Sequence, residues 1–293
     1  METSFCFRVD IDTWEGIHKG LPECIKLAKE YSSPITYYLS LGNYATGRNL
    51  FRIIKKKESI KRKIPVWERN HWKDLFRGIL LPPKQIGKNT VNELQEYEAN
   101  EYSEFHPHGY NQVIWAKQFD KFNLDNTSEY LDLLIQEYLK IFGKQPEANA
   151  APNFVVNPFY LKILSKKKFK FASDFKYHSP FSLSLDNGTS SIVQLPVTEE
   201  TIESLIVRGK SKIEIVDFYK QRFQELVDKG ITYVCLYSHA IYEPLKLRPI
   251  IEDIFRLATK FDMKPSTHSE YYSKIKQYPT INIDKVLKET YKE

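Results

Sequence analysis

The stretch SFCFRVDIDT (residues 4–13) decides the fold, because an apolar segment of strand type ends in two closely spaced carboxylates. Its aromatic and β-branched side chains predict a buried strand over Ser4–Asp10. In parallel α/β folds the carboxyl ends of the strands build the ligand site, so Asp10 and Asp12 are candidates for a general base and a metal ligand. The alternative is that both carboxylates only accept hydrogen bonds from the following turn.

Strand and helix patterns alternate along the rest of the chain. The expected strands are 35–41, 191–195 and 231–237, and the expected helices are 21–31, 89–97, 128–142, 158–167, 213–228 and 248–261. Repeated β-then-α order predicts an α/β protein with a mainly parallel sheet or barrel covered by helices. No linker-like composition interrupts the chain, so residues 1–293 are expected to form one domain.

The composition excludes disordered and membrane-spanning classes, with 42% hydrophobic and 27% charged residues. The N-terminus lacks the basic and apolar regions of a secretory signal, and no segment offers about 18 uninterrupted apolar residues. We therefore expect the protein to stay in the cytoplasm. Cys6, Cys24 and Cys235 have no metal-binding or disulfide spacing and are expected to be buried reduced thiols.

Positive charge is concentrated at 48–88, where 13 Lys and Arg stand against three acidic residues in a chain of net charge +6. Such a surface suits an anionic partner, and interleaved tryptophans suit a membrane interface. The expected membrane-binding side chains are Lys55, Lys56, Lys57, Lys61, Arg62, Lys63, Trp67 and Trp72. The alternatives are an ordinary helical hairpin with core aromatics and a nucleic-acid binder; no signature of a nucleic-acid module is visible, so no nucleic-acid partner is expected.

Histidines supply the remaining chemistry. The segment EFHPHGYNQ (residues 104–112) holds His106 and His108 in a Pro- and Gly-containing loop, where imidazoles could approach one metal ion. His239 follows the expected strand 231–237 and is placed to donate a proton to a leaving group. The alternatives are exposed loop histidines without a role and a core histidine with satisfied hydrogen bonds.

Several short segments in order resemble the NodB-homology polysaccharide deacetylases, and especially the deformylases that act on formamido-arabinose attached to undecaprenyl phosphate. The opening RVDIDT (residues 8–13) is similar to the R-V-D-[VI]-D-T signature of that branch. The further matches are GRNLFR (47–52), LPPKQIG (81–87), EFHPHGYNQVIW (104–115), AAPNF (150–154), ASD (172–174), QLPVT (194–198) and His239-Ala240.

The resemblance implies a deformed (β/α) barrel with the site at its C-terminal mouth. It implies Asp10 as the catalytic base, Asp12 and His108 as metal ligands, and His239 as the acid that protonates the leaving amine. It also implies a divalent metal, with zinc expected and Co, Ni or Mn as alternatives. Arg8, Asn153 and Asp174 are expected to contact the substrate. Amide hydrolysis needs an activated water, a polarised carbonyl and a protonated nitrogen, which this set of groups provides.

Two departures from the family pattern bear on activity. Gln112 stands where a second histidine ligand is expected, and His106 is the candidate substitute. Asn153-Phe154-Val155 stands where the family has Gly-Trp and a polar or cationic residue. The resemblance predicts a metal-dependent hydrolase that removes a formyl or acetyl group from an aminosugar on a polyprenyl phosphate, working peripherally at the inner face of the cytoplasmic membrane. The departures favour the alternative of a catalytically inactive homologue that binds a lipid-linked sugar or a partner protein.

Overall fold

A computed structural model describes residues 2–44, 76, 80–82, 84–87, 90–185, 188–189 and 192–291. Most of the basic segment at 48–88 lies outside these residues, including all eight expected membrane-binding side chains. Within the described part, Phe76 and Leu80 have exposed side chains, at 39% and 74%. No helix among the described residues has the length and apolar character needed to cross a bilayer.

The central sheet is parallel and carries the opening stretch in its middle. Its strands run in the order β11 (Tyr233–His239), β1 (Ser4–Ile11), β2 (Ile35–Leu39) and β5 (Ser103–Pro107), and β12 (Lys264–Pro265) also pairs with β1. All eight residues of β1 are buried, as parallel strands covered on both faces require. The prediction of a mainly parallel sheet is therefore confirmed.

A second parallel sheet continues the curve of the first. It contains β6 (Ala148–Asn149), β7 (Phe171–Ala172) and β10 (Val193–Gln194), in the order β10-β7-β6. A few backbone hydrogen bonds link the two sheets at both ends: Ala150 N donates to Pro107 O at 3.0 Å, and Thr198 N and Glu199 N donate to Cys235 O at 3.0 and 3.2 Å. The strands of both sheets therefore surround a common interior, although the ladder of backbone hydrogen bonds is interrupted where one sheet meets the other.

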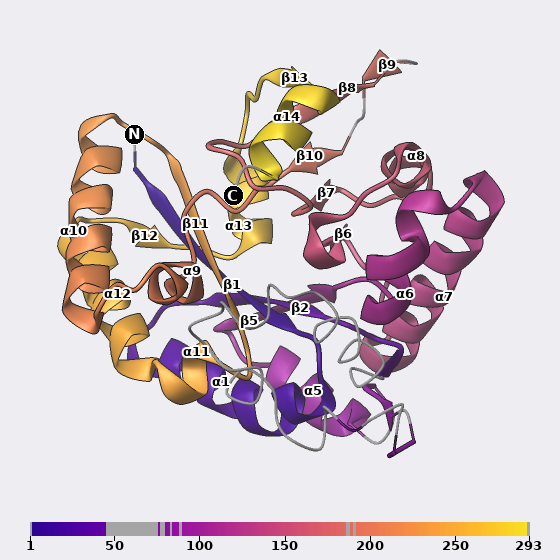
Figure 1. Ribbon diagram of the computed structural model, residues 1–293, viewed down its shortest axis with the longest axis horizontal. Coiled ribbons are helices and arrows are strands. Elements are labelled where there is room, and N and C mark those ends of the chain that lie inside the picture. Colours follow the sequence, from indigo (N-terminus) through magenta and orange to yellow (C-terminus); the bar gives the residue numbers. More distant parts are fainter. Residues whose placement is uncertain are drawn as a thin grey trace.

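Helices cover the outside of these strands (Figure 1). The longer ones are α1 (Leu21–Glu30), α5 (Val91–Glu98), α7 (Leu124–Phe142), α8 (Pro158–Lys166), α10 (Lys212–Asp228) and α12 (Arg248–Lys260). The shorter ones are η1 (Gly16–Gly20), α6 (Gln112–Gln118), η3 (Phe119–Lys121), η4 (Pro152–Phe154), α9 (Ile202–Val207), α11 (Glu243–Lys246), α13 (His268–Lys274) and α14 (Ile283–Thr290). Small strands pair β3 (Asn43–Tyr44) with β4 (Lys84–Gln85), and β8 (Ser182–Leu185) with β9 (Gly188–Thr189) and β13 (Thr280–Asn282).

The expected elements agree with these bounds except in three places. The helix expected from residue 128 begins at Leu124, because the side chain of Asn123 caps it by accepting from Asn126 N. The loop expected at 104–107 was wrong, since Ser103–Pro107 forms β5. The strand expected at 191–195 is confined to Val193–Gln194. The three cysteines are buried free thiols, as predicted.

Candidate active site

The acidic end of β1 lies beside the histidine that ends β11. Asp10 and His239 are direct partners in the pairing of these two parallel strands. Asp12 follows β1 immediately, and His108 follows β5 on the other side of the sheet. These four residues are spread over more than 200 positions of the sequence, and all lie where parallel strands end. That is where α/β folds build their ligand sites.

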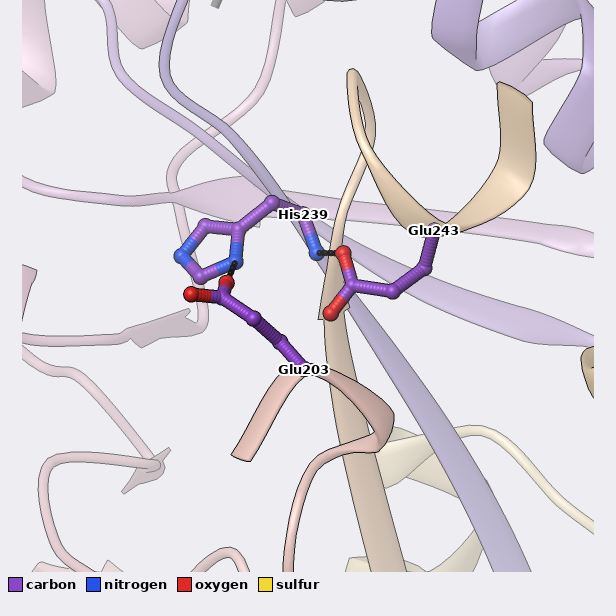
Figure 2. A group of neighbouring side chains, drawn as sticks. All are labelled: Glu203, His239 and Glu243. Atoms are coloured by element: carbon purple, nitrogen blue, oxygen red, sulfur yellow. Dashed lines mark hydrogen bonds and ion pairs between the residues drawn. The ribbon is translucent and has the colours of Figure 1, made fainter. Parts of the chain in front are cut away.

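His239 is held between two glutamates (Figure 2). Its backbone N donates to Glu243 Oε2 at 3.0 Å, and its ring Nδ1 lies 3.8 Å from Glu203 Oε2. Burial opposes protonation of this imidazole, but the neighbouring carboxylates, with Glu243 first, outweigh burial and raise the pKa of His239. A raised pKa favours the protonated form of His239, which is the form that a general acid needs.

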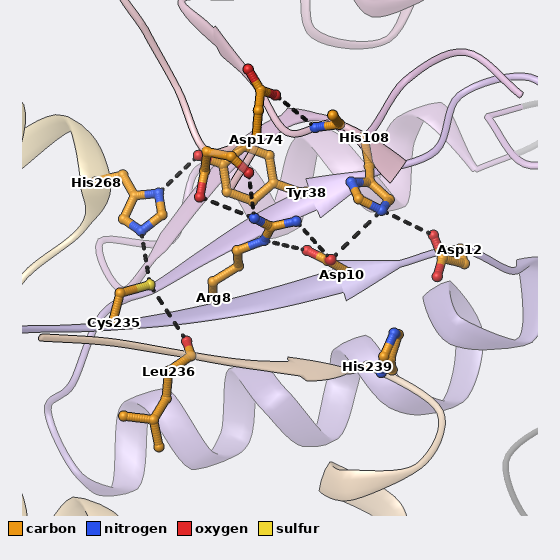
Figure 3. A network of polar contacts seen from close by, with 12 residues as sticks. Arg8, Asp10, Asp12, Tyr38, His108, Asp174, Cys235, Leu236, His239 and His268 are labelled. Atoms are coloured by element: carbon orange, nitrogen blue, oxygen red, sulfur yellow. Dashed lines mark hydrogen bonds and ion pairs between the residues drawn. The ribbon is translucent and has the colours of Figure 1, made fainter. Parts of the chain in front are cut away.

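Asp10 is bound by a buried arginine of its own strand (Figure 3). Arg8 Nε and Nη2 donate to the two carboxylate oxygens of Asp10 at 2.7 and 2.8 Å, and Nη1 donates to Ser173 O at 2.6 Å. The guanidinium also lies against the ring of Tyr38, 4.8 Å from its centroid. Burial opposes ionisation of Asp10, but the Arg8 charge and then His108 lower the pKa of this carboxyl.

His108 faces both aspartates with one nitrogen. Its Nε2 lies 3.6 Å from Asp10 Oδ2 and 3.5 Å from Asp12 Oδ1, both longer than a normal hydrogen bond. Its Nδ1 has no hydrogen-bond partner within the described residues. The turn that orients this ring depends on Gly109. Its φ is +64°, and a Cβ at this position would lie 2.6 Å from the Trp115 ring.

Gln112 comes from another element. It is the first residue of α6, whose N-cap Asn111 accepts hydrogen bonds from Val113 N and Ile114 N. A small pocket is lined by Gln112 together with Asp12 and Ser40. His108 lies before this helix and does not line that pocket, so the two residues do not share a helical face.

His106 lies deeper in the structure than His108. It belongs to β5, is only 4% exposed, and its Nε2 lies 3.1 Å from Glu104 Oε1. Its ring packs against those of Tyr38 and Phe171. Residues two apart on a strand point to the same side but are separated along it, so His106 is placed one layer below the mouth.

The three residues expected to contact the substrate have different surroundings. Arg8 and Asp174 are fully buried, and the expectation that they contact a substrate stays a prediction. Asp174 accepts hydrogen bonds from Ala151 N, Tyr160 Oη and Gln194 Nε2, and burial raises its pKa to about 6. Asn153 is exposed and has a left-handed backbone with φ +53°.

Glu203 was not predicted from the sequence. It lies in α9, 36 residues before His239, and nothing in its local pattern distinguishes it from an ordinary acidic residue in the first turn of a helix. Its position beside His239 results from the way α9 follows the second sheet and returns to β11. Residues of this kind require the tertiary structure.

Comparisons with known proteins agree with the motifs. The chain is 21% identical over 255 residues to a Shewanella sediminis protein named "Probable 4-deoxy-4-formamido-L-arabinose-phosphoundecaprenol deformylase ArnD", covering 86% of this chain and 80% of that protein. It is 22% identical over 245 residues to a protein of the same name from Wigglesworthia glossinidia brevipalpis, covering 83% and 84%. No protein-family model matches the chain.

The fold has solved counterparts. The structure titled "probable Polysaccharide deacetylase" from Pseudomonas aeruginosa PAO1 superposes with a TM-score of 0.62 at 12% identity, covering 92% of this chain and 90% of that chain. The expected fold class, a deformed (β/α) barrel of the polysaccharide deacetylase type, is therefore confirmed. The chain resembles the NodB-homology polysaccharide deacetylases, as its motifs predicted, and the relatives that it matches bear the name of the deformylase branch.

Proposed function

We propose that the protein is a metal-dependent hydrolase that removes a formyl or acetyl group from an aminosugar carried on a polyprenyl phosphate. One observation carries the proposal: at the ends of β1 and β5, His108 Nε2 lies within 3.6 Å of a carboxylate oxygen of both Asp10 and Asp12. His239 pairs with Asp10 on the next strand. The names of the relatives supply the class of substrate.

The protein groups divide the proton transfers between two sides of the site. Asp10 accepts a proton from the attacking water, because its lowered pKa keeps it ionised at neutral pH. Arg8 fixes both carboxylate oxygens and so orients this base, although the same ion pair weakens its basicity. His239 donates a proton to the departing nitrogen, and its raised pKa provides that proton.

Asp12 and His108 are the residues that would hold a divalent ion. Their facing atoms lie 3.5 Å apart without forming a hydrogen bond, as donor atoms of a shared ion can. Gln112, which lines a pocket together with Asp12, is the third donor, and its amide oxygen is a poorer zinc ligand than imidazole. A bound ion would polarise the acyl carbonyl and lower the pKa of a water. Zinc is the expected ion, with Co, Ni or Mn as alternatives.

Peripheral membrane association is proposed because a polyprenyl-linked substrate resides in the bilayer. The exposed Phe76 and Leu80 belong to the tryptophan-bearing basic segment at 48–88 and suit an interface between lipid and water. Cations at 55–63 would meet anionic headgroups of the inner leaflet of the cytoplasmic membrane.

The test is an assay for amine release from formylated and acetylated lipid-linked aminosugars, run with metal analysis of the same preparation. We expect turnover that depends on a bound divalent ion and is lost in His108→Ala. The matched control is His178→Ala, which removes an exposed histidine whose Nδ1 lies 3.6 Å from Glu289 Oε2, far along the chain from the site. Absence of turnover with both substrates, in protein that carries its ion, would refute the proposal.

A second candidate function is a homologue that binds a lipid-linked sugar or a partner protein without hydrolysing it. Gln112 in place of an imidazole and Val155 in place of a cation favour it. The two functions separate in one preparation: substrate binding with neither metal nor turnover supports the binding protein, whereas metal-dependent amine release supports the hydrolase.

A further inference from the structure

The carboxylates around His239 form a second group of potential ligands. Ligand atoms of Glu203, His239 and Glu243 all lie within 4.8 Å of one another (Figure 2). The three residues come from α9, the end of β11 and the start of α11. We propose that Glu203, His239 and Glu243 bind a divalent cation at a site separate from the one at Asp12 and His108.

Glu243 shows why a cation is needed there. Its side chain is completely buried, and Oε2 accepts the hydrogen bond from His239 N. Its Oε1 has no hydrogen-bond partner within the described residues, although buried polar atoms are nearly always paired. Figure 2 shows this carboxylate turned toward the space between His239 and Glu203. A buried carboxylate oxygen without a partner is costly, and a cation in that space would reduce the cost.

The pKa of Glu243 agrees with this geometry. Burial first, with a contribution from Glu203, raises it to about 7 although His239 opposes the shift. Two carboxylates therefore compete for one imidazole, whose Nδ1 lies at 3.8 Å from Glu203, too far for a good hydrogen bond.

The donor set defines the class of ion. Two carboxylates and one imidazole are the ligands of first-row divalent ions, and Zn²⁺ with three protein ligands keeps a fourth position open for water. The side chain of Glu203 is 12% exposed, so an ion could enter from that side. An ion on Nδ1 excludes a proton from the same atom, so occupancy of this site and the imidazolium form of His239 are mutually exclusive.

The experiment measures Zn²⁺ binding to the full-length chain by equilibrium dialysis. The first variant, Asp12→Asn/His108→Ala, removes two donors of the other site, and we expect it to retain one Zn²⁺ per chain. Adding Glu203→Gln should weaken that binding by at least about tenfold, since even substitution of residues behind a metal ligand costs about 10–100-fold in affinity. Adding Glu200→Gln instead is the matched control, because Glu200 is an exposed neighbour bound to Arg208; this change should leave the affinity unaltered.

Thermal unfolding tests whether each variant keeps its fold and whether the ion stabilises it. Zn²⁺ should raise the Tm of Asp12→Asn/His108→Ala, because a ligand of the native state stabilises it, and should lose this effect after Glu203→Gln. No Zn²⁺ in the double variant, or equal affinity with and without Glu203→Gln, would overturn the proposal. Neither result depends on amine release, so failure of the proposed hydrolase activity leaves this test intact.

Discussion

Replacement of Arg8 by Met tests how much the buried ion pair contributes to the stability of the site. Arg8 is 0% exposed and binds both oxygens of Asp10, at 2.7 and 2.8 Å. Met is apolar and unbranched, so Arg8→Met leaves Asp10 as a buried carboxylate without its main counter-charge. Removal of one partner of a buried ion pair costs about 3–5 kcal/mol in the free energy of unfolding.

The expected change in melting temperature follows from that free energy. In domains of 150–250 residues a loss of 1 kcal/mol lowers Tm by about 2–4 °C, so Arg8→Met should melt roughly 6–20 °C below the wild type at pH 8. Arg8→Lys is the matched control, because lysine keeps the charge but cannot bind a carboxylate at two points. It should melt between the two.

The dependence on pH identifies Asp10 as the group responsible. Because its folded pKa is lowered, the pair stabilises the wild type above the ordinary Asp pKa of about 3.9, and this contribution is lost as the pH falls through the lowered folded value. Without Arg8, burial alone should raise the pKa of Asp10, as it raises that of buried Asp174 to about 6. The penalty in Arg8→Met is then relieved as the pH falls through the raised value.

Circular dichroism melts at pH 5 and pH 8 measure both effects. The difference in Tm between wild type and Arg8→Met should be smaller at pH 5 than at pH 8. Equal melting temperatures at pH 8 would falsify the assignment of a stabilising role to the pair. A difference that does not change with pH would show that the loss comes from packing around Arg8 and not from the charge of Asp10.

Three further predictions concern the chemistry. Gln112→His should raise Zn²⁺ affinity by at least about tenfold and increase amine release, because imidazole is the better ligand; equal affinity in dialysis would mean that residue 112 does not contact the ion. The rate of amine release should fall as the pH rises through the raised pKa of His239. Glu203→Gln should move this fall in rate to lower pH, because the change removes one of the carboxylates that raise the pKa of His239. A fall in rate that stays at the same pH would assign it to another group. Charge reversal at 55–63 should release the protein from anionic liposomes in a flotation assay. High salt should do the same, because the attraction between charges is screened over about 8 Å already at physiological ionic strength. Retention on the liposomes under both conditions would exclude this segment as the anchor.

The fold was predictable where its elements are long and their patterns regular. The opening strand has eight buried residues, and α12 repeats apolar side chains at helical spacing, so both were found. The strand β5 was missed because Glu104 and His106 place polar side chains on its inward face, which the hydrophobic pattern reads as a loop. The strands β6 and β7 have two residues each and offer no period to detect.

The candidate site was predictable to the extent that it lies at strand ends. Asp10 and His239 could be grouped because parallel strands bring their carboxyl ends together, whereas His108 was grouped with them only through the resemblance to the deacetylases. The role of Arg8 could also have been inferred, since residues two apart on a strand share a face and an arginine can fold back onto the next acid. Glu203 could not, because only the tertiary path of α9 brings it to His239.

The charges around the mouth connect these observations. Four carboxylates meet there in the described part of the chain, and they face one guanidinium and two histidines: the acids are Asp10, Asp12, Glu203 and Glu243. Arg8 neutralises only Asp10, to which it is bound at two points. Because Gln112 and a histidine ligand are both neutral, the substitution at 112 changes the quality of one ligand without changing the charge of the mouth. The four carboxylates are therefore present whichever residue stands at 112, and the two proposed ion sites are two places where a cation would meet them.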